Sequence, residues 1–180
     1  MIVSPGSGGT LSRSEKQEQL RKILLEKMGR TRTAPTSFSQ ERLWFIDRLE
    51  PGGTVYNLSV ARRLEGALDG AALERALGEI VRRHEALRTV FGEVDGSPVQ
   101  VIASFGGFAL PVEDLSELSD ADREAAVQRR AGDEVRRPFD LSAGPLFRAA
   151  LLRLGAEDRV LLLSMHHIVS DGWSMGVLFR

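Results

Sequence analysis

The chain has 180 residues, 42% of them hydrophobic and 27% charged, with a formal net charge of −1 and no cysteine. This length suits one domain with its own core, the balanced charge argues against a nucleic-acid partner, and the lack of cysteine excludes disulfides and thiolate chemistry. Because no apolar run reaches the ~18 residues of a membrane span and the N-terminus lacks the layout of a signal peptide, we expect a cytoplasmic protein without a membrane partner.

The N-terminal part is predicted to contain a tail, a helix and a linker. Residues 1–11 are rich in glycine and serine and are expected to be disordered. Residues 12–30 open with the capping box Ser12–Glu15 and continue with apolar residues at helical spacing. This helix is expected either to pack on the main domain or to dock an upstream protein. Residues 31–35 are predicted to be a linker.

The remainder of the chain alternates between helical and strand patterns. Ser37 and Asp69 are typical helix caps, and each precedes apolar residues at spacings of three and four. Helices are predicted at residues 37–49, 69–84, 119–137 and from about 172 onward. Strands are predicted at about residues 56–64, 87–94, 98–103, 147–154 and 160–166, and the last four form two hairpins. This order predicts an α/β (α+β) domain with a mixed or antiparallel sheet covered by helices.

The candidate active site is the segment 165–174, which directly follows the apolar run 160–163. Side chains alternate along a strand, so His166 and His167 should point to opposite sides. This divergence argues against one metal ion bound by both, and no cysteine or third histidine lies nearby in the sequence to complete a tetrahedral site. We expect one imidazole to face a cavity and the other to lie in the core. An imidazole is the natural proton acceptor at neutral pH.

Asp171 and Gly172 complete the candidate site. In an apolar setting the charge of Asp171 needs a cationic partner or several hydrogen bonds. Gly172 would let the backbone approach closely, or would offer an N–H group where a helix begins. On these residues alone, catalysis and a hydrogen-bonded pair of core histidines both remain open.

Two further patterns are interpreted as structural. Residues 172–176 match G-x-S-x-G, but residues 166–171 separate them from the strand, so a nucleophile elbow is not expected. His84 lies on the apolar stripe of its predicted helix and is expected to be a core or hydrogen-bonded residue.

Three segments resemble the signature motifs of the condensation domains of nonribosomal peptide synthetases. Residues 37–44 (SFSQERLW) are similar to S-x-A-Q-x-R-L-W, with Ser39 in place of the usual alanine. Residues 83–91 match R-H-E-x-L-R-T-x-F, and residues 165–174 match M-H-H-x-x-x-D-G-W-S. Residues 138–146 are similar to a further stretch common in the family. The resemblance covers about residues 36 to 180.

The resemblance implies a chloramphenicol acetyltransferase-like fold with two lobes, of which residues 31–180 would be the N-terminal lobe. The C-terminal lobe is then absent, and this chain alone is expected to be inactive. The implied reaction is amide bond formation between aminoacyl or peptidyl thioesters in antibiotic and other secondary metabolism. Its partners would be donor and acceptor carrier proteins, which hold the substrates on 4′-phosphopantetheine, and a neighbouring adenylation domain. No bound cofactor is implied.

The resemblance also implies roles for the site residues. His167 would face the tunnel between the lobes and either take a proton from the acceptor amine or position that amine. His166 would support the loop from within, and Gly172 would line the site. Asp171 would form a structural ion pair with an arginine, for which Arg63 is the candidate.

Three alternatives concern the reaction. Residues 168–170 are similar to the subclass that joins two L-configured residues. An epimerisation domain of the same superfamily would share the histidine motif but invert a stereocentre. A non-catalytic lobe would only dock carrier proteins.

Overall fold

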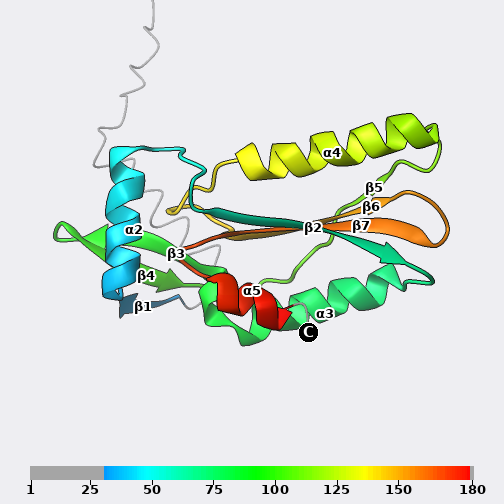
Figure 1. Cartoon of the computed structure of the whole chain (residues 1–180). Coiled ribbons are helices and arrows are strands. Elements are labelled where there is room, and N and C mark those ends of the chain that lie inside the picture. The colour runs from blue at the N-terminus through cyan, green and yellow to red at the C-terminus, as the bar shows by residue number, and fades with distance from the viewer. Residues whose placement is uncertain (1–30, 179–180) are drawn as a thin grey trace, which may run out of the picture.

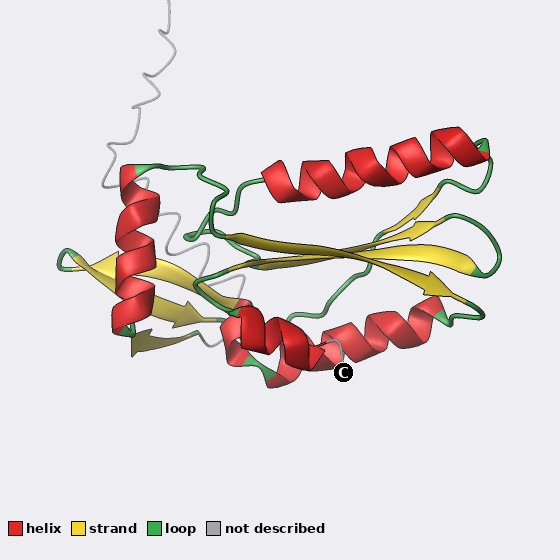
Figure 2. Ribbon diagram, viewed as in Figure 1, coloured by secondary structure: helices red, strands yellow, loops and turns green. Residues whose placement is uncertain are grey.

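The computed structural model describes residues 31–178, which fold into two sheets with helices around the larger one (Figure 1). This part of the chain has four α-helices and seven strands. Figure 2 distinguishes helices from strands by colour. The predicted domain with a helix-covered mixed sheet is confirmed. The tail and the helix predicted within residues 1–30 lie outside the described residues.

The smaller sheet is antiparallel and has the order β1–β4–β3. Strand β3 (Thr89–Val94) and strand β4 (Ser97–Ile102) form the predicted hairpin. Its two-residue loop is Asp95-Gly96, with φ of 50° and 79°. Positive φ at both central residues is the conformation that an Asp-Gly hairpin turn favours, which is why the sequence signal was reliable here.

Strand β1 (Arg32–Pro35) occupies most of the segment predicted to be a linker, so that prediction is wrong. It pairs with β4 in the register Arg32 to Ile102 and Pro35 to Val99. Four residues without polar–apolar alternation carry no strand pattern of their own. A proline is tolerated because this strand lies at the sheet edge.

The larger sheet has the order β2–β7–β6–β5. Strand β7 (Asp158–His166) lies between β2 (Asn57–Glu65) and β6 (Phe147–Arg153) and is antiparallel to both. Strand β5 (Val112–Asp114) adds a short parallel edge that the sequence did not predict. Every residue of β7 from Val160 to His166 is buried, because helices cover both faces of the sheet.

Alternate residues of β7 enter two different cores. Leu161 and Leu163 pack with α3 (Gly70–Arg83), through Leu77 and Val81. Neighbouring positions on the opposite face pack with α4 (Asp120–Arg136). Figure 1 shows α4 on one side of the sheet and α3, with α5 (Gly172–Leu178) beside it, on the other. Helix α2 (Phe38–Leu49) stands against the smaller sheet.

Helix α3 begins at the cap that the sequence predicts, and its end determines the position of His84. Asp69 Oδ1 accepts a hydrogen bond of 3.0 Å from the Ala72 N–H and starts α3. The helix ends at Arg83, and His84 forms its C-cap and is exposed. The prediction of a core position for His84 is therefore wrong, since the chain leaves the helix before the apolar stripe reaches that residue. Within residues 31–178, no helix has the length and apolar composition needed to cross a membrane.

Candidate active site

The two adjacent histidines lie where β7 ends. His166 is the last residue of the strand and is paired with Asn57 of β2. Its N–H donates to the Leu146 carbonyl at 3.1 Å, and the His167 N–H donates to the Tyr56 carbonyl at 2.9 Å. The backbone of both histidines is thus held by the residues that directly precede β6 and β2.

The two histidines differ in burial, as expected for one imidazole in the core and one outside it. His166 is 3% exposed and shares the face of the sheet that α4 covers, whereas His167 is exposed. The His166 ring lies between Tyr56, with ring centroids 6.3 Å apart, and Phe139, at 6.1 Å. Sequence reasoning gives neither aromatic residue a role. Phe139 lies in one of the stretches that carry the family resemblance, but nothing in the sequence indicates which residue it contacts.

His166 is a neutral structural residue. Its Nδ1 atom accepts a hydrogen bond of 3.1 Å from the Ile168 N–H, which places the ring proton on Nε2. Burial, and to a smaller extent the nearby charge of His167, lowers the pKa of His166 to about 4. With Nδ1 occupied and the ring enclosed, His166 is not available to a substrate.

His167 is the imidazole that a ligand can reach. Among residues 31–178 its ring makes no hydrogen bond or ion pair, while its backbone N–H is held by Tyr56. A free imidazole on a fixed backbone can accept a proton or a hydrogen bond from a group that arrives at this surface.

Asp171 caps helix α5 instead of forming a buried ion pair. Its Oδ1 accepts hydrogen bonds from the Ser174 N–H at 2.8 Å and the Ser174 hydroxyl at 2.6 Å. These bonds, with a smaller contribution from the charge of His167, lower the pKa of Asp171 below its usual value. The carboxylate is exposed, so it needs no cationic partner.

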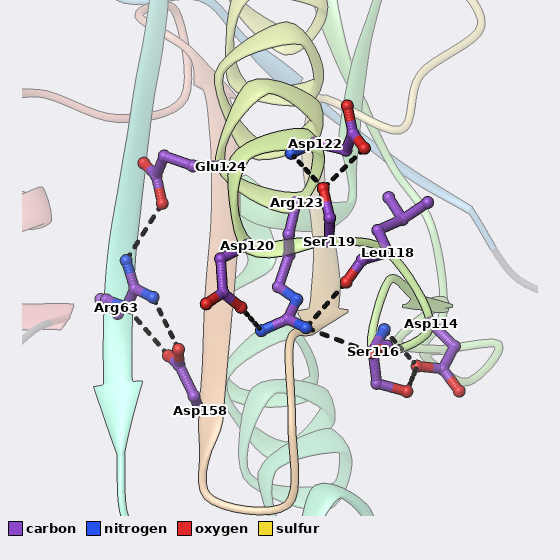
Figure 3. A network of polar contacts seen from close by, with 10 residues as sticks. All are labelled: Arg63, Asp114, Ser116, Leu118, Ser119, Asp120, Asp122, Arg123, Glu124 and Asp158. Atoms are coloured by element: carbon purple, nitrogen blue, oxygen red, sulfur yellow. Dashed lines mark hydrogen bonds and ion pairs between the residues drawn. The ribbon is translucent and has the colours of Figure 1, made fainter.

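The predicted pair between Asp171 and Arg63 is wrong. Arg63 donates to Asp158 at 2.9 and 2.6 Å and to Glu124 at 3.2 Å, as Figure 3 shows. It is paired with Val160, six register positions from the end of β7 at His166. At roughly 3.3 Å per position this is about 20 Å along the sheet, beyond the reach of an arginine side chain.

Gly172 is exposed and begins α5. Within the part of the chain described here, nothing lies within 4 Å of the position that a Cβ atom would take at this residue. These neighbours therefore give no reason for a glycine, and its role in lining a site stays a prediction.

Several large apolar side chains of α5 and α2 are exposed. Trp173 and Val177, on α5, are 76% and 55% exposed. Phe38, Phe45 and Leu49, on α2, are 92%, 58% and 65% exposed. A separate cavity of about 650 Å³ lies between residues 103–109 and the edge of β6, and neither histidine lines it. The candidate site is therefore an exposed surface and not part of this cavity.

The family model and two similar relatives point to the same family. The condensation domain matches residues 30–180. One of the linear gramicidin synthase subunits of Brevibacillus parabrevis is 48% identical over 163 residues, covering 91% of this chain and 2% of that protein. Phosphinothricin tripeptide synthetase PhsC of Streptomyces viridochromogenes is 49% identical over 146 residues, covering 81% of this chain and 13% of that protein.

A solved structure gives the same result for the fold. The starter condensation domain of rhizomide synthetase RzmA superposes with a TM-score of 0.74 and 30% identity, over 83% of this chain and 36% of that one. The predicted chloramphenicol acetyltransferase-like fold is confirmed by this likeness. The chain spans a small part of the curated relatives and about a third of the solved domain.

Proposed function

The chain belongs to the condensation-domain family of nonribosomal peptide synthetases, and we propose that with the rest of its protein it joins two carrier-bound aminoacyl or peptidyl groups by an amide bond. The observation that carries this proposal is the exposed ring of His167, which forms no hydrogen bond or ion pair with residues 31–178 and whose backbone N–H is held by the Tyr56 carbonyl. His166 is buried and already accepts a hydrogen bond from the Ile168 N–H. In this proposal His166 therefore supports the loop, and His167 takes part in the reaction.

The reaction is an attack by the acceptor amine on the donor thioester carbonyl. A C–N bond forms and the donor C–S bond breaks, so the thiolate of the donor phosphopantetheine arm leaves. His167 either removes the proton of the amine or holds the amine by a hydrogen bond, and the proton ends on the leaving sulfur. No bound cofactor is needed, since both substrates arrive as thioesters.

Residues 31–180 form the N-terminal lobe of this domain in our proposal, and a second lobe packs against them. The exposed apolar side chains of α2 and α5 support this assignment, because a contact with another lobe would remove them from water. The match to about a third of the RzmA condensation domain supports it too. Because the acceptor and donor would meet between two lobes, the 180-residue chain alone is expected to be inactive.

The partners in this proposal are a donor and an acceptor carrier protein and a neighbouring adenylation domain. Both joined residues are L-configured, on the similarity of residues 168–170 to that subclass. His166 and Asp171 act as supports of the loop, and Gly172 lines the site toward the second lobe.

The test uses a two-lobed protein that carries this chain, with both carrier proteins loaded. His167→Ala should lower the rate of amide formation by ~10²-fold, the usual contribution of a positioned acid or base. His84→Ala is the matched control, because it removes an exposed imidazole from the end of α3. An unchanged rate in folded His167→Ala rejects the proposed role. Product with an inverted stereocentre and no amide would indicate epimerisation, and carrier binding without any product would indicate a docking lobe.

A further inference from the structure

The side chain of Gln40 forms a hydrogen bond between helix α2 and the histidine segment. Gln40 is half-buried and sits at the third position of the helix, inside the motif at residues 37–44. Its Nε2 atom donates to the Ile168 carbonyl at 3.3 Å and to Gln100 Oε1 at 3.3 Å. Its Oε1 atom accepts from the Ser37 N–H at 2.9 Å.

The direction of this amide is fixed by its partners. The Ser37 N–H can only donate, so the amide oxygen must face it. The nitrogen then faces two acceptors, one of which is the carbonyl oxygen of Ile168. Gln100 is fixed in the same way, because its own nitrogen donates to the Pro35 carbonyl at 2.8 Å. Turning either amide would place two acceptors against each other.

Ile168 directly follows His167 and is held on three sides. Its carbonyl accepts from Gln40, and its N–H donates to His166 Nδ1 at 3.1 Å. Its side chain is 4% exposed in the cluster that Leu43 and Trp44 of α2 pack against. The residue before His167 is equally fixed, because His166 ends the strand. The orientation of the His167 ring therefore depends on these two anchored neighbours.

We infer that Gln40 is a positioning residue for His167, because its amide nitrogen holds the Ile168 carbonyl and so fixes the turn that carries the exposed imidazole. This inference rests on the proposed function of His167. It also accounts for the choice of residue in the capping box. Glutamate at this position caps a helix as well as glutamine does. A second carboxylate oxygen, however, would face the Ile168 carbonyl and Gln100 Oε1 with no proton to share.

Gln40→Glu separates the two roles of this residue. The variant keeps the acceptor for the Ser37 N–H and adds a negative charge at a helix N-terminus, where such a charge is favourable, so the helix should stay capped. It replaces the donor to Ile168 by an acceptor. Ser39→Glu is the matched control, because it adds the same charge one residue earlier on an exposed position. We expect both variants to remain folded, with the helix capped.

The readouts are the rate of amide formation in the two-lobed protein and amide hydrogen exchange of Ile168 in the 180-residue chain. Gln40→Glu should form product about 10-fold or more slowly than Ser39→Glu, with unchanged affinity for the loaded carriers, because a misplaced catalytic group lowers turnover rather than binding. The Ile168 N–H should lose protection in Gln40→Glu only. A rate equal to that of Ser39→Glu overturns the inference.

A second pair of variants covers the case in which Gln40→Glu folds poorly. Ser37→Ala removes the hydroxyl that accepts from the Gln40 N–H at 3.3 Å, and so weakens only the cap. Gln40→Ala weakens the cap and removes the bond to Ile168. Slow turnover in Gln40→Ala alone supports positioning, whereas equal loss in both variants shows a cap effect and rejects it. An unchanged rate in His167→Ala would instead reject the proposed function, and this inference with it.

Discussion

The buried imidazole of His166 should make the stability of this chain depend on pH in a defined direction. Its pKa in the folded protein is lowered from 6.5 to about 4, chiefly by burial. In the unfolded chain the same ring takes up a proton below about pH 6.5. Lowering the pH from 6.5 toward 4 therefore favours the unfolded state, which binds more protons.

The size of this effect follows from the pKa difference. One pKa unit corresponds to about 1.4 kcal/mol, so the free energy of unfolding should fall by at most about 1.4 kcal/mol for each pH unit in this range. Over the whole range the loss is on the order of 2–3 kcal/mol. This is a substantial part of the ~5–15 kcal/mol that stabilises a typical domain.

Urea unfolding of the 180-residue chain at several pH values between about 7 and 4 measures this loss. The reference is His166→Asn, whose amide oxygen replaces Nδ1 as acceptor for the Ile168 N–H and does not titrate. The variant should be less stable near neutral pH, because it fills less space, and the difference from the wild type should shrink as the pH falls. Exposed carboxylates titrate in both proteins and cancel. If the free energies of unfolding of the wild type and His166→Asn fall in parallel with pH, the claim that His166 is buried and neutral is refuted.

Two other predictions concern charged residues of the described region. Asp171→Asn should leave the melting temperature nearly unchanged, because asparagine also caps helices and the carboxylate is exposed, whereas Asp171→Ala should lower it. A large loss of stability in Asp171→Asn, measured by thermal unfolding, would instead indicate that Asp171 forms an ion pair and does not merely cap the helix. Arg63→Ala should cost less than about 1 kcal/mol in urea unfolding and less still at high salt, because its bonds to Asp158 and Glu124 are solvent-exposed. A larger, salt-independent loss would contradict this.

Local signals in the sequence predicted much of the fold. Asp69 marked the start of α3, and Asp95-Gly96 marked the hairpin between β3 and β4. In each case the signal and the structure it determines lie within a few residues of each other. The apolar run at residues 160–163 likewise predicted a strand, and the structure buries both of its faces.

Strands β1 and β5 could not be predicted, because they are short and depend on distant partners. Arg32 is paired with Ile102, and Val112 with Leu151. Three or four residues have too little alternation to indicate a strand, so these segments become strands only when a longer strand offers them an edge.

The candidate site was predictable in part. Strand alternation alone separated His166 from His167, since it depends only on neighbouring positions. The partner of Asp171 is Ser174, only three residues later. The predicted pair with Arg63 failed because an ion pair between distant residues depends on strand register, which the sequence does not show. Gln40 lies 128 residues before its contact Ile168. Its place in the capping box already explained a glutamine there, so the sequence carried no sign of the hydrogen bond to Ile168.

The most direct test of the central claim is the single-turnover rate of the chemical step with both carriers preloaded and bound to a two-lobed protein. With His167→Ala this step should slow by about 100-fold, while carrier affinity and melting temperature remain those of the wild type. A variant that binds both carriers and joins their cargo at the wild-type rate would contradict the assignment of His167.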